Sequence, residues 1–317
     1  ETPADALELE LQMKLGMLLM QIDGFGAPQT SQCFVRAREL ATKLRQTDLY
    51  IVACAGLSAT LWAAGRYRDV LRMVGDVAAD ELERLQPMSR VFRSLVMALA
   101  EFHLGELRAA DAHSREALHE LDGVPAEQRV DIGGIDPEVM VLSQRVAVLV
   151  HQGRLDQAAA STARAIGVAD RRGHPPTRTW ALALVRWEAF RRGDMAESMR
   201  ISRELLGMAE RLGFHARIAT GQMMLGRALV GAGEIEEGRR LLRQGHADWM
   251  AAGSLATGSE YASHAAEALI NGGLPGDAVY FVEAGEKLVT EIEERFFEAE
   301  LLRQRGRLAE KGLHRDG

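Results

Sequence analysis

Histidine and cysteine are the side chains of this sequence that could hold a metal ion or act as nucleophiles. The chain has nine histidines and two cysteines, Cys33 and Cys54. None of them follows the His-Glu-x-x-His or Cys-x-x-Cys spacing that places ligands around zinc. Both cysteines lie in apolar stretches, which favours buried thiols in a reducing compartment over a disulfide. We therefore expect no metal site and a cytoplasmic location.

Phosphate chemistry would require a glycine-rich loop that ends in lysine and a hydroxyl residue. The four lysines, Lys14, Lys43, Lys287 and Lys311, are each followed by Leu or Gly, so no such loop is present. Gly231 to Gly238 has the wrong spacing for a dinucleotide loop, and no strand pattern precedes it. Gly253-Ser254 lacks the pattern of a nucleophile elbow. The sequence therefore predicts a protein without catalytic residues or cofactors.

Charge and hydropathy exclude two kinds of partner. The net charge is −7 and no segment is a basic block, so nucleic acid is not expected as a partner. No apolar run reaches the roughly 18 residues of a membrane span. The acidic runs Glu234 to Glu237 and Glu291 to Glu294 start or follow predicted helices, where we interpret them as solvated helix ends. A binding role remains, and it depends on how the helices are arranged.

Regularly spaced glycines indicate that arrangement. Seven glycines follow one another at intervals of 20 residues: Gly153, Gly173, Gly193, Gly213, Gly233, Gly253 and Gly273. Glycine commonly terminates helices because it has no Cβ to clash at positive φ. Alternate glycines are followed five residues later by mostly small side chains, including Ala158, Ser198, Gly238 and Ala278, which suit a close crossing of two helices. The repeating unit is therefore a helical hairpin of about 40 residues.

Helical hairpins of this kind bury their apolar faces by stacking into a superhelix. We predict an all-α protein, an α-solenoid with a right-handed superhelix, formed by about seven hairpins and a closing helix. One interval between turn glycines is eight residues too long, and the excess predicts an inserted loop at 122–137, between the third and fourth repeats. Asp136 and Pro137 at its end are typical of a helix start. We expect this loop to pack along the concave side.

The hairpin turns resemble those of the tetratricopeptide repeat (TPR), lengthened from its usual 34 residues to about 40. Three segments, Leu7 to Leu44, Asp136 to Ala158 and Phe296 to Leu301, resemble more specifically the C-terminal repeat region of bacterial STAND or AAA NTPases. Such regions are often linked to adenylate or guanylate cyclase domains, and MalT-like activators use a similar solenoid to sense a small ligand. The resemblance implies a sensor or partner-binding arm. Because the chain begins without Met and lacks NTPase and cyclase motifs, we expect residues 1–317 to be a single solenoid from a longer multidomain protein.

The repeat also indicates which side chains face the concave groove. If the first helix of each hairpin lines the groove, residues 13, 10, 6 and 3 before the turn glycine point inward, and those two before it flank them. The predicted groove residues are Trp62, Phe92, Phe102, His103, Met140, His151, Trp180, Trp187, Phe190, Arg191, Met223 and Arg227. In the last hairpin the matching positions include Glu260 and Glu267. Aromatic stripes at helical spacing are more often core than binding surface. Their alignment over several repeats nevertheless predicts an apolar floor.

Two functions fit these features. The first is a non-catalytic sensor or adaptor arm of a bacterial signalling protein, which binds a protein partner, other domains of the same chain or a small-molecule effector in its groove. The second is a structural spacer or oligomerisation solenoid without a ligand, whose groove is empty or filled by the chain's own segments. An enzyme is disfavoured because no usual catalytic constellation is present.

Overall fold

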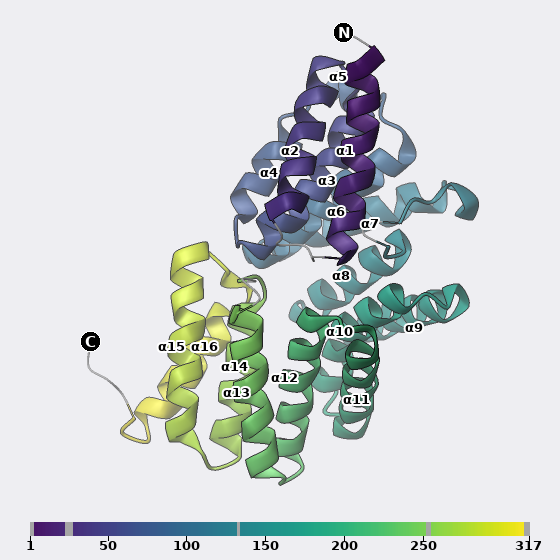
Figure 1. The fold of residues 1–317 in the computed structure, drawn as a ribbon. Helices are drawn as coiled ribbons and strands as arrows, with labels where there is room; N and C mark the ends of the chain where they lie inside the picture. Colours follow the sequence, from purple (N-terminus) through teal and green to yellow (C-terminus); the bar gives the residue numbers. More distant parts are fainter. Residues whose placement is uncertain (1–2, 23–27, 132–133, 252–254, 314–317) are drawn as a thin grey trace.

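The chain forms a solenoid of helical hairpins, shown as a computed structural model in Figure 1. The structure describes residues 3–22, 28–131, 134–251 and 255–313, apart from the side chains of residues 21, 22, 79, 187, 188, 190, 191 and 216. The seven hairpins are α1 (Pro3–Ile22) with α2 (Pro28–Lys43), α3 (Thr47–Ala63) with α4 (Tyr67–Gly75), α6 (Pro87–His103) with α7 (Leu107–Asp122), α8 (Pro137–His151) with α9 (Leu155–Arg172), α10 (Pro175–Arg191) with α11 (Met195–Leu212), α12 (His215–Gly231) with α13 (Ile235–Ala251), and α14 (Gly258–Asn271) with α15 (Pro275–Ile292).

A closing helix, α16 (Glu298–Ala309), follows the seventh hairpin, and α5 (Ala79–Leu82), η1 (Ala126–Gln128) and η2 (Arg295–Phe297) are short connecting turns. No strand occurs in the described part of the chain. The predicted all-α solenoid of about seven hairpins and a closing helix is confirmed. None of the described helices is long and apolar enough to cross a membrane.

The turn glycines end the helices as the sequence predicts. Helix α8 ends two residues before Gly153, which has a φ of 71°. The backbone N–H of Arg154 then donates to the Leu149 carbonyl at 2.9 Å, which closes the helix end. Positive φ recurs at the turn glycines from Gly65 to Gly273 that the structure describes. Gly24 and Gly253 lie outside the described residues.

Small residues allow the two helices of a hairpin to cross closely. In the sixth hairpin, Gly226 of α12 faces Gly238 of α13, and a Cβ added to Gly238 would lie 2.6 Å from the Gly226 carbonyl oxygen. Ala110, Ala158 and Ala278 take the corresponding place in other hairpins and are 0% exposed. The second hairpin departs from the pattern because α4 has 9 residues and ends at Gly75, before Asp76, two poor helix formers in succession.

The connection between α7 and α8 packs against neighbouring helices. Val124 and Ile135 are 5% and 4% exposed, and the Arg129 guanidinium donates to the Val124 and Leu121 carbonyls and to Glu138. Asp131 pairs with Arg172 of α9. These contacts are with α7, α8 and α9, and the packing of the loop along the concave side stays a prediction.

Asp136 caps α8 as its position before Pro137 predicts. Its side chain is 6% exposed, accepts from the Glu138 and Val139 N–H groups at 2.8 and 3.3 Å, and pairs with Arg172 at 2.9 Å. We expect Asp136→Ala to lower the free energy of unfolding by about 1–2 kcal/mol, measured by urea denaturation, because it leaves helix N–H groups unpaired. Asp156→Ala, at an exposed position in the first turn of α9, is the matched control. Equal midpoints for the two variants would contradict the capping role.

The superhelix curves back on itself, so the last hairpin lies beside the second and third. Figure 1 shows α14 to α16 next to the end of the N-terminal half that contains α3, α4 and α6. The Leu255 N–H donates to the Ala63 carbonyl at 2.7 Å, and a Cβ on Gly65 would meet Ile292. Two segments far apart in the sequence thereby form one surface, and four of the predicted groove residues, Trp62, Phe102, His103 and His151, lie at this contact.

Candidate functional site

Four of the predicted groove residues gather at the C-terminal ends of α3, α6 and α8. Trp62, Phe102, His103 and His151 lie two or three residues before a turn glycine, which places them in the last turn of their helices. The Phe102 and His151 ring centroids are 5.1 Å apart, and those of Trp62 and His103 are 5.7 Å apart. The repeat spacing therefore brings these side chains together, as expected.

A segment from the far end of the chain covers this cluster. The Phe296 ring, in η2, lies with its centroid 4.6 Å from Phe102, 5.1 Å from His103 and 5.7 Å from His151. Phe102 and His103 are 2% and 1% exposed as a result. The aromatic floor is therefore covered by Phe296 in this structure, whereas the sequence predicted an open one. Residues 292–297, which join α15 to α16, are called the covering segment below.

The other predicted groove residues lie elsewhere. Four of them precede a turn glycine by 10 or 13 positions and so lie nearer the start of their helix, where the adjacent hairpin packs. They are at most 8% exposed: Phe92, Met140, Trp180 and Met223. Met140 and Trp180 belong to one core cluster, and Met223 packs with Trp249 and Tyr261 in another. These four side chains fill space between hairpins and do not form an open floor. The side chains of Trp187, Phe190 and Arg191 lie outside those described.

Glu294 fixes the covering segment in place. Its carboxylate accepts from the Tyr67 hydroxyl at 2.6 Å and from the backbone N–H groups of Thr257 and Ser259 at 2.5 and 2.7 Å. It thus joins α4 to the N-terminus of α14, where the helix dipole favours a negative charge. Glu294 is 0% exposed, so the interpretation of the run Glu291 to Glu294 as solvated is wrong for this residue. Burial raises the pKa of Glu294, and the three hydrogen bonds oppose that shift.

His103 is held as a neutral imidazole. The Trp62 Nε1–H donates to Nε2 of His103 at 3.2 Å, which assigns the ring proton to Nδ1, and Nδ1 donates to the Leu99 carbonyl at 2.8 Å. The Tyr67 ring stacks on the imidazole at 4.8 Å. Burial lowers the pKa of His103 to about 4, since a buried imidazolium would lose its hydration.

The pKa of His103 predicts a loss of stability in acid. Because its folded pKa is below the ordinary value of 6.5, the contribution is complete above pH 6.5 and is lost as the pH falls toward 4. We expect this group to remove about 3 kcal/mol of unfolding free energy over that interval. Urea denaturation from pH 7 to 4 should show a steeper decline for the wild type than for His103→Gln. Other titrating groups are common to both proteins and cancel in the comparison. If the unfolding free energies of the two proteins fall in parallel with pH, the low pKa assigned to His103 is wrong.

A second group of polar side chains lies inside the fifth to seventh hairpins. Arg186 and Glu260 form an ion pair and are 7% and 1% exposed. Arg227 pairs with Glu267 at 2.7 Å, and both residues were expected to face the groove. Burial raises the pKa of Glu260 to about 7 although Arg186 opposes the shift. Charge pairs therefore join α10 to α14 and α12 to α14.

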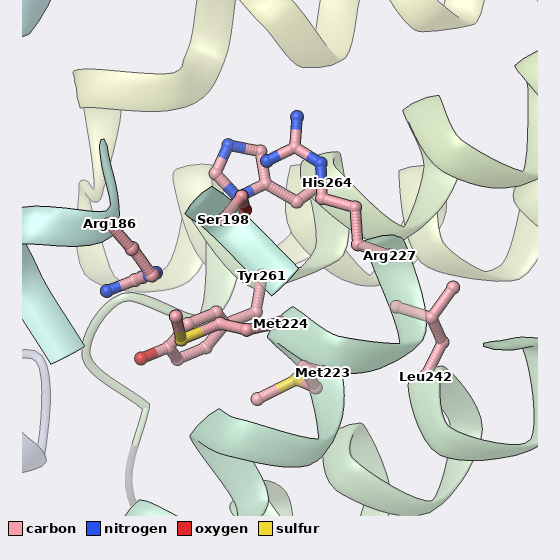
Figure 2. Close-up of a pocket in the computed structure, with 8 residues that line it drawn as sticks. All are labelled: Arg186, Ser198, Met223, Met224, Arg227, Leu242, Tyr261 and His264. Carbon is pink, nitrogen blue, oxygen red and sulfur yellow. The ribbon is translucent and has the colours of Figure 1, made fainter. Parts of the chain in front are cut away.

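A small cavity lies beside these ion pairs. Its volume is about 20 Å³, enough for one water molecule. Figure 2 shows the residues that line it, namely Arg186, Ser198, Met223, Met224, Arg227, Leu242, Tyr261 and His264. The Tyr261 and Thr220 hydroxyls are 3.2 Å apart. The described residues contain no group of three His, Cys, Asp or Glu side chains that could hold a metal ion.

Sequence reasoning missed the residues that close the superhelix. Tyr67 and Glu294 are 227 residues apart, and Arg186 and Glu260 are 74 apart, so no local spacing relates the partners. One signal was present: Phe296 and Phe297 are adjacent aromatic residues in a run rich in Glu and Arg. Such a pair at the junction of two helices indicates a buried contact, which the structure places on His103 and His151.

Comparison with known proteins shows the fold. No protein-family model matches the sequence, and no curated protein matches it. Solved structures do match, with TM-scores of 0.67 for a Rap protein complexed with competence and sporulation factor, 0.61 for NprR in complex with its cognate peptide NprX, and 0.53 for the apo form of RapI. The sequence identities are 14%, 11% and 12% in that order.

The three similarities extend over nearly the whole chain. They cover 96%, 98% and 95% of this chain and 81%, 84% and 86% of the Rap, NprR and RapI chains. The chain thus has the TPR-like helical-repeat fold of these proteins. At such low identity the similarity establishes the fold, and the function has to be argued from the site.

Proposed function

We propose that this chain is a non-catalytic sensor or adaptor arm that binds an extended peptide segment or a partner protein on its concave side. The observation that carries the proposal is the covering segment. This short stretch of chain packs across the ends of α3, α4, α6 and α8, where its Glu294 carboxylate and its Phe296 ring make the main contacts. That the ends of these helices hold a short segment of chain through an acidic and an aromatic side chain supports the proposal.

The solved structures of similar fold support this proposal. NprR was solved with its cognate peptide, and the Rap protein was solved with competence and sporulation factor. Both proteins are solenoids, and most of this chain aligns with each of them. By analogy, we propose that this chain binds a regulatory partner, which is a peptide, a protein or a small effector.

The wider context comes from the resemblance to STAND and AAA NTPase repeat regions. We propose that residues 1–317 are a single solenoid of a longer bacterial signalling protein, with an NTPase or cyclase domain as the catalytic part. Other domains of that protein are then candidate partners. In this proposal the arm works in the cytoplasm, without a cofactor, nucleic acid or membrane as its partner.

The proposal is tested with a pool of random octapeptides. Immobilised protein captures peptides from the pool, and fluorescence anisotropy measures the Kd of the enriched sequences. We expect Trp62→Ala, at the half-buried edge of the aromatic cluster, to weaken binding by about tenfold or more. Leu302→Ala, at a residue that is 58% exposed on α16, is the control and should bind as the wild type does.

A structural spacer is the second candidate, and one observation favours it. The aromatic cluster of the second to fourth hairpins is already filled by the chain's own Phe296. If no peptide is enriched, or if Trp62→Ala binds the enriched peptides unchanged, binding on the concave side is wrong and the spacer is the better description.

A further inference from the structure

Arg217, near the start of α12, is an arginine without a counter-charge. It is half-buried, and its guanidinium carbon lies 4.8 Å from the centroid of the Trp180 ring. No described residue forms an ion pair or a hydrogen bond with its guanidinium. Its neighbours Arg186 and Arg227 are each paired, with Glu260 and Glu267. Among the described residues, Arg217 thus lacks the acidic partner that Arg186 and Arg227 have.

The surroundings of Arg217 make this lack of a partner costly. Burial lowers its pKa, and the charge of Arg186 lowers it further. A guanidinium that has lost water and gained no carboxylate is unfavourable, because desolvation of a charge is offset only by pairing or hydrogen bonding. Stacking on Trp180 offsets part of this cost. The edge of the guanidinium still carries N–H donors without acceptors in the described part of the chain.

Arg217 lies at the partly exposed end of a helix face that is otherwise buried between hairpins. It precedes Thr220 by three residues, so it extends by one helical turn the face that contains Thr220, Met223 and Arg227. Its electrostatic neighbours Arg186 and Tyr261 come from α10 and α14 and also line the small cavity. Arg186 lies over the Tyr261 ring, with 5.6 Å to the centroid. The fifth and sixth hairpins thus hold a half-buried cation over an aromatic ring, where part of its side chain reaches solvent.

We propose that Arg217, whose guanidinium lies over the Trp180 ring and near Arg186, binds a carboxylate of the partner segment. The inference rests on the proposed function and names the chemistry of one contact. A guanidinium offers two parallel N–H donors to a carboxylate while its face stays on an aromatic ring, which a lysine ammonium does not match. The carboxylate belongs either to the C-terminus of a peptide or to an Asp or Glu side chain.

The experiment uses three pools of random octapeptides on the immobilised protein. One pool has free C-termini, the second is amidated, and the third is amidated and contains no Asp or Glu. Mass spectrometry measures the amount retained. We expect the pool without carboxylates to be retained at least about tenfold less than the pool with free C-termini. Retention of the amidated pool shows whether a C-terminal or a side-chain carboxylate is bound.

Variants assign the effect to Arg217. Arg217→Gln should reduce retention of the carboxylate-containing pools at least about tenfold, and Arg217→Lys should give an intermediate loss. Arg203→Gln, at an exposed position of α11, is the matched control and should retain them as the wild type does. Because Arg217 lacks an acidic partner, Arg217→Gln should melt at the same temperature as the wild type or higher. A lower melting temperature would overturn the view that its charge is uncompensated.

Failure of this inference differs from failure of the proposed function. Equal retention of all three pools by the wild type, or an unchanged Arg217→Gln, overturns the carboxylate contact and leaves peptide binding standing. If the wild type retains no pool, peptide binding is wrong. The melting temperature measured with added citrate then decides whether Arg217 binds a carboxylate at all. A citrate-dependent rise in melting temperature for the wild type but not for Arg217→Gln supports an anion site, and an equal rise or none overturns it.

Discussion

Replacing Glu294 by alanine is expected to lower the free energy of unfolding by about 3 kcal/mol. The substitution leaves the Tyr67 hydroxyl and the Thr257 and Ser259 N–H groups without an acceptor in a place that water does not reach. Each unsatisfied buried donor costs about 1–3 kcal/mol, and partial relaxation keeps the total below their sum. Urea denaturation monitored by circular dichroism measures the effect.

The neighbouring residue provides the control for Glu294. Glu293 forms an exposed ion pair with Arg68, so Glu293→Ala should change the unfolding midpoint little. Glu294→Gln keeps the shape and one acceptor oxygen, so its stability should lie between those of the wild type and Glu294→Ala. If Glu294→Ala unfolds with the same midpoint as Glu293→Ala, the closure of the superhelix does not depend on this carboxylate.

Gly238→Ala should destabilise the sixth hairpin by about 3 kcal/mol or more. The new methyl group would lie 2.6 Å from the Gly226 carbonyl oxygen and 2.8 Å from the Val230 backbone nitrogen, and backbone atoms cannot move aside as a flexible side chain can. The helices α12 and α13 would have to separate, which costs packing along their whole contact. Differential scanning calorimetry measures the loss.

Gly306→Ala is the matched control for this effect. Gly306 lies within α16, and apart from its own turn of helix nothing lies within 4 Å of the place where its Cβ would be. Alanine is the better helix former there, so Gly306→Ala should raise the stability by about 0.5–1 kcal/mol. A similar result for Gly238→Ala would show that the two helices cross less closely than the structure indicates.

The repeat architecture could be predicted because it depends on local sequence. A glycine that ends a helix acts through its own φ, and a small residue at a crossing acts on the hairpin that contains it. Gly153 and Gly238 therefore have their roles wherever the hairpin lies in the superhelix. The start of α8 at Pro137, with Asp136 as its cap, follows from the same local rules.

The closure of the superhelix could not be predicted because it depends on the sum of small rotations between successive hairpins. Whether Phe296 reaches Phe102 is set by the curvature of all the hairpins between them, and no single residue encodes that curvature. Periodicity also assigned Trp180 and Met223 to the groove, although they pack between hairpins. Helical spacing shows which side chains share a face, and it does not distinguish a face covered by a neighbouring hairpin from one that is open.

The bond between Tyr67 and Glu294 spans 227 residues of sequence, and this affects how the array unfolds. Repeat proteins whose units contact only their neighbours can fray from either end, one unit at a time. Here the seventh hairpin cannot detach without breaking its contacts with the second and third, so the units between them should melt as one cooperative block. Contacts of such high sequence separation also slow folding. Independent fraying is then expected for the first hairpin, α1 and α2, and for the closing helix α16, which lie outside the closed part of the array.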